Sequence, residues 1–480
     1  MKKTILLAML LVAFVAMPAM ASVQNVKISG SIDSTWLVRN NFDLGLNNIG
    51  DESQNLFITQ AILQADADLT DNVSTTIALI NERVWGDTAA NTSDSANSTD
   101  VDLLLAYVTL REMLYSPLTV VVGRQAFHYG NSFIVDSGGT NNAAPADSGL
   151  VVAGDLTKQT VQDAFRFIFD YEPLSIEVLV SKVGSNTNTL AVDDQDDIDL
   201  YGVNAGYELG DSMNTQVEAY FFAKIDKLNP TVAAGEFSKS DTVYVPGLRA
   251  STNPIEGLNV QLELAWQRGN RVATTGTIRD NEQREAMGAQ FISSYQVPVL
   301  EEYKPILGYV YTYVSGDTNP DDRAVTGAGN NQGQAANRHT AWDPMYENQS
   351  GGTIYNTLFN LSNAHIHTLS AQVNPIEDVT TKVSWSNLRL DKELRTGQTF
   401  AILQPDGGGT AATGFKAGED DLGNEIDVTA TYDYTEDVQF GANLGWYMPG
   451  DLFSDATGGA LGSRADHVAT QAIVHGNVNF

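Results

Sequence analysis

The densest group of ligand-type side chains in this sequence is an acidic run between two predicted strands. Carboxylates stand at Asp193, Asp194, Asp196 and Asp197, and Asp199 follows. Carboxylate oxygens are the hard donors that Ca²⁺ prefers. The run lacks the central glycine and the terminal glutamate of an EF-hand loop. We therefore interpret it as a solvated loop, with a divalent-cation site as the weaker alternative.

Two other groups could take part in hydrolysis or metal binding. Asp136 and Ser137 precede two glycines in a predicted loop, but a nucleophilic serine needs a histidine base held by a buried carboxylate, and no such motif accompanies the pair. His365 and His367 share one strand parity and could bind a metal with a third ligand. That parity is also the parity of nearby apolar residues, which places both histidines on an outer rim. We expect no catalysis and no cofactor.

The elements that position these residues are β-strands, because alternation dominates the sequence. In the stretch DAFRFIFDY, Phe165, Phe167 and Phe169 alternate with Arg166 and Asp170. Successive side chains of a strand point to opposite faces. One face is therefore aromatic and the other charged. Since buried unpaired charge is very costly, we expect the charged face in water and the aromatic face in lipid.

The number, length and wiring of the strands predict one architecture. About eighteen alternating segments follow one another, and most are long enough to supply the roughly 9–11 residues that a barrel strand needs to cross a bilayer. Short connections such as 70–72 and 210–212 alternate with long polar ones such as 131–162 and 316–364. This wiring is typical of an all-β transmembrane antiparallel barrel with short periplasmic turns and long extracellular loops.

Composition and the two ends of the sequence add constraints. A basic start, an apolar run and the small-residue site Ala19-Met20-Ala21 predict a signal peptide over residues 1–21, which leaves 22–480 as a single barrel domain. The 480 residues contain 0 cysteines. Their net charge of −32 argues against a nucleic-acid partner. We expect Phe480, at the end of an amphipathic segment, to engage the outer-membrane insertion machinery.

Aromatic residues near the ends of the predicted strands are expected to form interfacial girdles against membrane lipid. These residues are Trp36, Trp85, Tyr129, Tyr313, Trp385, Tyr434 and Trp446.

Several motifs together resemble the alginate export family of outer-membrane porins. They are Ala106-Tyr107-Val108, Gly123-Arg124-Gln125 with Tyr129-Gly130, the tyrosines Tyr309, Tyr311 and Tyr313, Ser315-Gly316-Asp317 with Asn319-Pro320, and Trp342-Asp343-Pro344. The resemblance implies a monomeric 18-stranded barrel in the bacterial outer membrane. It also implies passive export or diffusion of an anionic polysaccharide through an arginine-lined pore.

Strand parity and the cost of charge in lipid select pore-lining candidates. They are Arg39, Arg124, Arg166, Asp170, Glu218, Lys224, Arg249 and Lys382. Arg124 and Arg166 fall on neighbouring strands, so we expect the two guanidiniums to lie near each other in the lumen. Many acidic residues share the inward parity, and we therefore expect a lumen of mixed or mildly acidic charge.

The sequence thus predicts a passive, porin-like channel for a hydrophilic solute, with an anionic polysaccharide as the solute that the resemblance implies. A general diffusion porin for small ions and sugars is the alternative within transport. A barrel-anchored adhesin and a barrel enzyme are alternatives from other classes; the enzyme would need a catalytic constellation that the sequence lacks.

Overall fold

The computed structural model describes residues 25–45, 53–86, 100–136, 149–184, 197–227, 240–275, 278–318, 338–348, 352–394, 400–402, 410–412, 415–416, 418–454, 457–458, 463–464 and 466–480. The predicted signal peptide and Asp193, Asp194 and Asp196 lie outside these ranges. No helix in the described ranges is long and apolar enough to cross a membrane.

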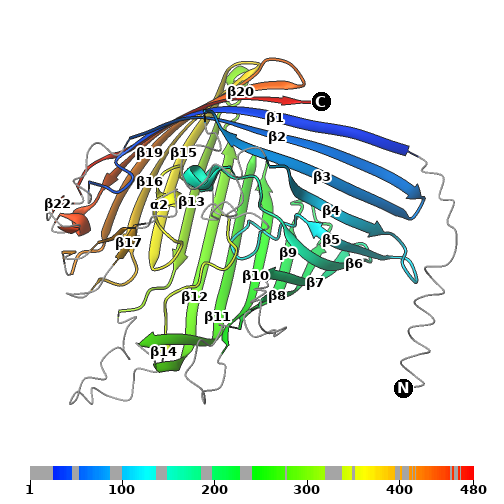
Figure 1. Cartoon of the computed structure of the whole chain (residues 1–480), viewed down its shortest axis with the longest axis horizontal. Helices are drawn as coiled ribbons and strands as arrows, with labels where there is room; N and C mark the ends of the chain where they lie inside the picture. The colour runs from blue at the N-terminus through cyan, green and yellow to red at the C-terminus, as the bar shows by residue number, and fades with distance from the viewer. Residues whose placement is uncertain are drawn as a thin grey trace.

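Eighteen antiparallel strands form a closed ring (Figure 1). They are β1 (Asn25–Asn40), β2 (Ser53–Thr70), β3 (Val73–Val84), β4 (Asp102–Leu110), β5 (Leu118–Gln125), β6 (Gln162–Asp170), β7 (Leu174–Gly184), β8 (Ile198–Glu208), β9 (Gln216–Asp226), β10 (Asp241–Ile255), β11 (Leu258–Thr275), β12 (Ile278–Gln296), β13 (Ile306–Val314), β15 (Ala364–Ile376), β16 (Val379–Leu390), β19 (Asp421–Asp433), β20 (Val438–Pro449) and β23 (Ala469–Asn479).

The ring closes because the last strand pairs with the first. β23 lies antiparallel to β1, with Ser31 opposite Asn479, and Figure 1 shows the red C-terminal strand beside the blue first one. Every other ring strand pairs with its neighbours in sequence order. The expected eighteen-stranded barrel is confirmed.

Short elements lie in the connections. They are β14 (Arg338–His339), β17 (Phe400–Ile402), β18 (Thr410–Ala412), β21 (Thr457–Gly458), β22 (Ser463–Arg464), α2 (Tyr355–Leu358) and the 3₁₀ turns η1 (Val151–Leu156), η2 (Glu301–Tyr303) and η3 (Asp451–Phe453). Tight turns join strands at one end of the ring, which we call the turn end. Longer connections gather at the other, which we call the loop end.

The two faces of the strands differ as alternation predicts. Phe165 is 50% exposed on the outer face of β6, whereas Arg166 points inward to Glu177 of β7. Aromatic rings stack on the outer face near the loop end, where Phe57 lies between Trp36 and Trp85. The expected outward aromatic surface therefore exists on these strands.

One predicted girdle residue, Tyr129, is instead buried inside the barrel. The sequence predicted that the long connection after this strand begins at residue 131, but β5 already ends at Gln125 and the chain then turns inward. Tyr129 is 7% exposed, and its hydroxyl donates to Glu177 on the inner wall. The expectation failed because the strand stops earlier than its sequence pattern suggested.

The loop end of the lumen contains an apolar cluster as well as polar groups. Phe133 and Trp342, from two different connections, stack with their ring centroids 5.5 Å apart and are nearly inaccessible to solvent. Phe222 of β9 and Leu358 of α2 belong to the same cluster. A ring of this size is wide enough to take in whole loops. The inner face is therefore not uniformly wet.

Candidate channel lumen

Residues 149–161 pack against the inner wall made by β1, β2 and β3. Arg39 donates from Nη1 to Asp155 at 3.0 Å and from Nε to Gln471 at 2.5 Å. Glu82 of β3 accepts hydrogen bonds from the hydroxyl of Thr157 and the backbone N–H of Lys158, both at 2.7 Å. This segment is thus attached to the wall by charge-assisted bonds at several points, which are stronger than neutral ones.

Lys158 adds an ion pair to the same attachment. Its ammonium contacts the carboxylate of Asp33 on β1, which also accepts from Asn477 at 2.7 Å. Burial lowers the pKa of Lys158 because it disfavours the charged form.

Residues 126–136 attach to the wall made by β6 to β11. Arg166 binds Glu177 in a bidentate manner, with Nε–Oε1 at 2.6 Å and Nη2–Oε2 at 2.9 Å, and Tyr129 donates to the same carboxylate. Burial, reinforced by the charge of Glu177, raises the pKa of Tyr129, so this residue remains a neutral donor. Arg249 contacts Glu218 and also donates to Asn131 of the loop at 3.2 Å.

Residues 338–348 attach through Asp343. Lys224 lies 2.6 Å from the Asp343 carboxylate and Arg284 lies 3.4 Å from it. The side chain of Gln267 donates to the Asp343 carbonyl at 2.7 Å and accepts from its N–H at 2.8 Å. Burial alone would raise the pKa of Asp343, but the two cations outweigh burial and hold it below its usual value.

A fourth attachment holds the start of α2. Glu425 of β19 accepts backbone N–H bonds from Thr353, Ile354 and Tyr355 at 2.6, 2.9 and 2.7 Å. Asp427, two residues along the same face, accepts from the Thr353 hydroxyl at 2.6 Å. A wall carboxylate thus satisfies donors at the beginning of a short helix that would otherwise be unpaired.

Most basic pore-lining candidates consequently serve as loop anchors. Arg39, Arg166, Lys224 and Arg249 all point inward as expected, and each is paired with a carboxylate. Their acidic partners lie on both the wall and the inner loops. These arginines and lysines offer no free positive charge to a solute.

Arg124 differs from its expectation, because it lies on the outer face. In the β5–β6 register it stands opposite Asp163, on the same face as Phe165, and its Nη1 lies 3.6 Å from the Asp163 carboxylate. Its Nε donates to the carbonyl of Leu103 at 3.0 Å. Arg124 and Arg166 therefore point to opposite sides of the wall and form no pair.

The position of Arg124 along the strand explains this exception. The cost that favoured an inward arginine applies at the middle of a bilayer, where it is about 2–4 kcal/mol, and falls to about 0–1 kcal/mol near the interfaces. Arg124 is the last residue but one of β5, at the loop end.

Lys382 points inward and stands apart from the other basic candidates. It shares parity with Ser384 and Ser386, which are buried, while Val383 and Trp385 are exposed on the outer face. No ion pair or hydrogen bond joins the side chain of Lys382 to another residue in the part of the chain that the structure describes.

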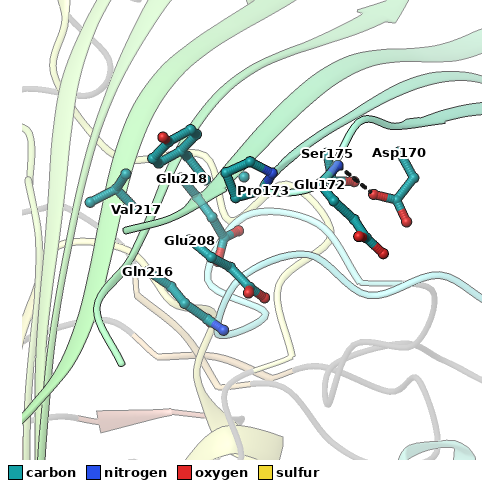
Figure 2. Close-up of a pocket in the computed structure, with 10 residues that line it drawn as sticks. Asp170, Glu172, Pro173, Ser175, Glu208, Gln216, Val217 and Glu218 are labelled. Carbon is teal, nitrogen blue, oxygen red and sulfur yellow. Dashed lines mark hydrogen bonds between the residues drawn. The ribbon is translucent and has the colours of Figure 1, made fainter. Parts of the chain in front are cut away.

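Asp170 and Glu218 lie in a cavity of about 510 Å³ at the turn end of the inner wall. Figure 2 shows that Glu208 and Glu218 come from β8 and β9, beside Glu172 of the β6–β7 turn. Among the described residues, no lysine or arginine lines the cavity. Glu218 is paired with Arg249, so Asp170, Glu172 and Glu208 carry most of its uncompensated negative charge.

The candidate metal ligands that the structure describes are not brought together. Asp197, the one described residue of the acidic run, lies 2.6 Å from the Lys182 ammonium. His365 and His367 face outward, as expected, and bond to the hydroxyls of Tyr311 and Tyr309 at 2.8 and 2.9 Å. Within the described ranges no three His, Asp or Glu side chains are arranged to hold a metal ion.

Four site residues were not among the pore-lining candidates: Asp155, Lys158, Asp343 and Glu425, although Asp343 belongs to the Trp342-Asp343-Pro344 motif. The first three lie in connections, where alternation gives no information about direction. Glu425 shares parity with Asp427, which marks it as inward. Its three backbone partners lie about seventy residues away in the chain.

Residues 25–465 match the protein family described as alginate export. No curated protein matches the sequence. Among solved structures, Acinetobacter baumannii OccAB1 is 10% identical with a TM-score of 0.55, covering 96% of this chain and 98% of its own. Pseudomonas aeruginosa OpdK, in a structure with vanillate, is 9% identical with a TM-score of 0.53, covering 95% and 100%.

Pseudomonas aeruginosa OccK2 (OpdF), in complex with glucuronate, is 10% identical with a TM-score of 0.51, covering 95% of this chain and 99% of its own. At such low identities these likenesses establish the shared barrel fold.

Proposed function

This chain belongs to the alginate export family and is a porin-like channel of the bacterial outer membrane, and we propose that its solutes are hydrophilic, uronate-type sugars. A single anionic polysaccharide chain is the extended form of such a solute. The turn end of the barrel then faces the periplasm and the loop end faces the cell exterior. Passage is passive, through the space that the inner loops leave open.

The observation that carries the proposal is the set of anchored inner loops. Arg39–Asp155, Lys224–Asp343 and the bonds to Glu425 attach three connections to the inner wall. In a barrel of eighteen strands, loops fixed inside the lumen narrow an otherwise wide aqueous channel. Because these ion pairs fix the loops inside the lumen, the remaining channel is suited to selecting solutes by size and charge.

The family supports the solute class. Its name refers to alginate, a polymer of uronic acids, and two structures with the same fold were obtained with carboxylates, glucuronate and vanillate. The lumen also offers the hydroxyl, amide and carboxylate groups that hydrogen-bond to sugars. Conductance distinguishes this function from that of a barrel-anchored adhesin.

The test is single-channel recording of the purified protein in a planar bilayer. We expect stepwise conductance in potassium chloride. We also expect glucuronate to reduce the current in a concentration-dependent way, whereas glucose at the same concentration does not. A barrel that inserts without conducting would overturn the channel, and equal effects of the two sugars would overturn the solute class.

We also propose that β23 engages the insertion machinery together with Phe480, the residue that follows it. Phe480 is 61% exposed, and its backbone exchanges two hydrogen bonds with Gly30 of β1, at 2.9 and 3.0 Å. Phe480→Ser preserves these backbone bonds and removes the aromatic ring. We expect slower barrel assembly in cells and unchanged folding of the purified chain in detergent; normal assembly in cells would refute the role of the ring.

A further inference from the structure

The inner wall carries a strip of polar side chains that no anchored loop uses. Lys382 of β16 stands opposite Gln372 of β15 and opposite Thr429 of β19 in the strand register, and Thr429 stands opposite Asn443 of β20. Cross-strand partners point to the same face. These four residues therefore form one row across neighbouring strands, which we call the Lys382 strip.

The ammonium at the centre of the strip is free. Among lysines and arginines of inward strand parity in the described ranges, Lys382, Lys27 and Arg111 form no ion pair with a carboxylate. Arg111 lies in the β4–β5 turn, where it donates to the hydroxyl of Ser74 at 3.2 Å. Lys27 lies near the start of β1, before Ser31, where the pairing of β1 with β23 begins. It therefore lies at the periplasmic mouth of the barrel. Lys382 lies within the closed ring. Among the described residues, it is the inward cation of the ring strands above the turn end that has no ion pair.

The neighbours of Lys382 supply hydrogen-bonding groups without competing charge. Gln372 and Asn443 carry amides, and Thr429 carries a hydroxyl. The Asn443 Oδ1 atom is buried and has no hydrogen-bond partner, although buried polar atoms are normally paired. The nearest acid on the strip's own strands is Asp427, two residues from Thr429 on β19, and its Oδ1 accepts from the hydroxyl of Thr353.

The wall across the lumen has the opposite charge. The acidic cavity with Asp170, Glu172 and Glu208 belongs to β6, β7 and β8 and to the β6–β7 turn. In a closed ring of eighteen strands, β7 and β19 are half a circumference apart. Both features lie toward the periplasmic end, since Lys382 is the fourth residue of β16 and the cavity surrounds the turn.

From this arrangement we propose that the Lys382 strip is a binding site for the carboxylate of a sugar acid inside the channel. The ammonium of Lys382 takes the carboxylate, while Gln372, Thr429 and Asn443 bond to the sugar hydroxyls. The acidic wall repels the anion, and opposed charges on two walls steer it toward the strip. The inference rests on the proposed function and names the contact that gives it charge selectivity.

The first experiment compares Lys382→Gln with the wild-type channel in a planar bilayer, using D-glucuronate and glucose as probes. We expect the anion-to-cation permeability ratio to fall roughly two- to threefold, the size that Coulomb's law gives for one unit charge several ångströms from an ion in water. We also expect the reduction of current by glucuronate to weaken by a similar factor. The small effect of glucose should not change.

Lys27→Gln is the matched control, because it removes the other unpaired inward lysine without touching the strip. It should leave the glucuronate effect intact. Thr429→Val keeps every charge and should weaken the glucuronate effect while preserving the permeability ratio. Because neither Lys382 nor Lys27 is bonded to the wall, both variants should fold, which heat-modifiable migration can verify.

The outcomes separate the two proposals. A conducting Lys382→Gln channel with unchanged permeability ratio and unchanged response to glucuronate overturns the site and leaves the channel function standing. Equal effects of Lys27→Gln and Lys382→Gln also overturn it, because a general surface charge would then explain the selectivity. A wild-type barrel that does not conduct overturns the proposed function itself.

Discussion

Arg166 and Glu177 face each other across β6 and β7 inside the barrel, joined by two hydrogen bonds of 2.6 and 2.9 Å. Tyr129 of an inner loop donates to the same carboxylate. The arginine is therefore part of a fixed structure and is not a free charge for solutes. The same relationship recurs at Arg39, Lys224 and Arg249, so the lumen uses its cations chiefly to hold its loops.

The opposite orientations of Arg124 and Arg166 lead to a first prediction. Arg166→Ala leaves the charge of Glu177 without a cationic partner in the lumen, so we expect the anion-to-cation permeability ratio to fall roughly two- to threefold by Coulomb's law in water. Arg124→Ala changes a side chain on the outer face and should leave the ratio unchanged. Reversal potentials under a salt gradient measure both. An equal shift in the two variants would contradict the outward position of Arg124.

Asp343 should hold its loop in the lumen. Asp343→Asn removes the partner of Lys224 and one partner of Arg284, and breaking a buried ion pair by removing one partner costs about 3–5 kcal/mol. We expect a less stable inner loop, a higher and noisier single-channel conductance, and a shift toward anions. Asp170→Asn is the control, because Asp170 forms no ion pair among the described residues and its change removes a charge without releasing a loop. Identical conductance and urea stability for Asp343→Asn and wild type would refute the role of the loop.

The third prediction concerns acid. Burial, with the charges of Arg271 and Arg284, lowers the pKa of His339 to about 4, and the nearby carboxylates of Asp317 and Asp343 only partly oppose this. The unfolded histidine titrates near 6.5. Between these values the unfolded loop binds a proton that the folded loop does not. Stability is therefore complete above pH 6.5 and falls as the pH drops toward 4.

Trp342, which is 2% exposed and lies three residues from His339, can report this loss. We expect its fluorescence to shift toward that of a solvent-exposed indole between pH 6.5 and 4, and His339→Gln to flatten the shift in that window. Subtraction of the Trp342→Phe signal isolates this tryptophan from the other five. A shift that persists unchanged in His339→Gln would assign the acid response to other groups.

The absence of cysteine permits a direct test of topology, because each introduced thiol is unique. Glu393 follows β16 at the loop end, and Asp71 lies in the β2–β3 turn; both are exposed. A membrane-impermeant maleimide should label Glu393→Cys on intact cells and should label Asp71→Cys only after the outer membrane is opened. Labelling of Asp71→Cys on intact cells would reverse the orientation. Epitope tags at Ser95 and Asn330, outside the described residues, should behave like Glu393→Cys.

The sequence by itself determined the barrel, its eighteen strands and the direction of side chains in strongly alternating segments. Phe165 and Arg166 illustrate why, since their separation onto two faces follows from the two-residue period of any extended strand. The order of short and long connections is equally local. These features need no information about distant residues.

Only the tertiary structure decided which charges are free and which are tied. β5 is apolar on both faces: Val121 packs inside the barrel, and Val122 faces outward with Phe165. Its sequence therefore does not alternate between apolar and polar residues and could not show which way Arg124 points. Arg39 and Asp155 are 116 positions apart, and Lys224 and Asp343 are 119 apart. Such pairs form only after the ring closes and the loops enter it. The isolation of Lys382 has the same origin. Whether its charge is free depends on which wall residues the inner loops bind, and that is decided only in the folded barrel.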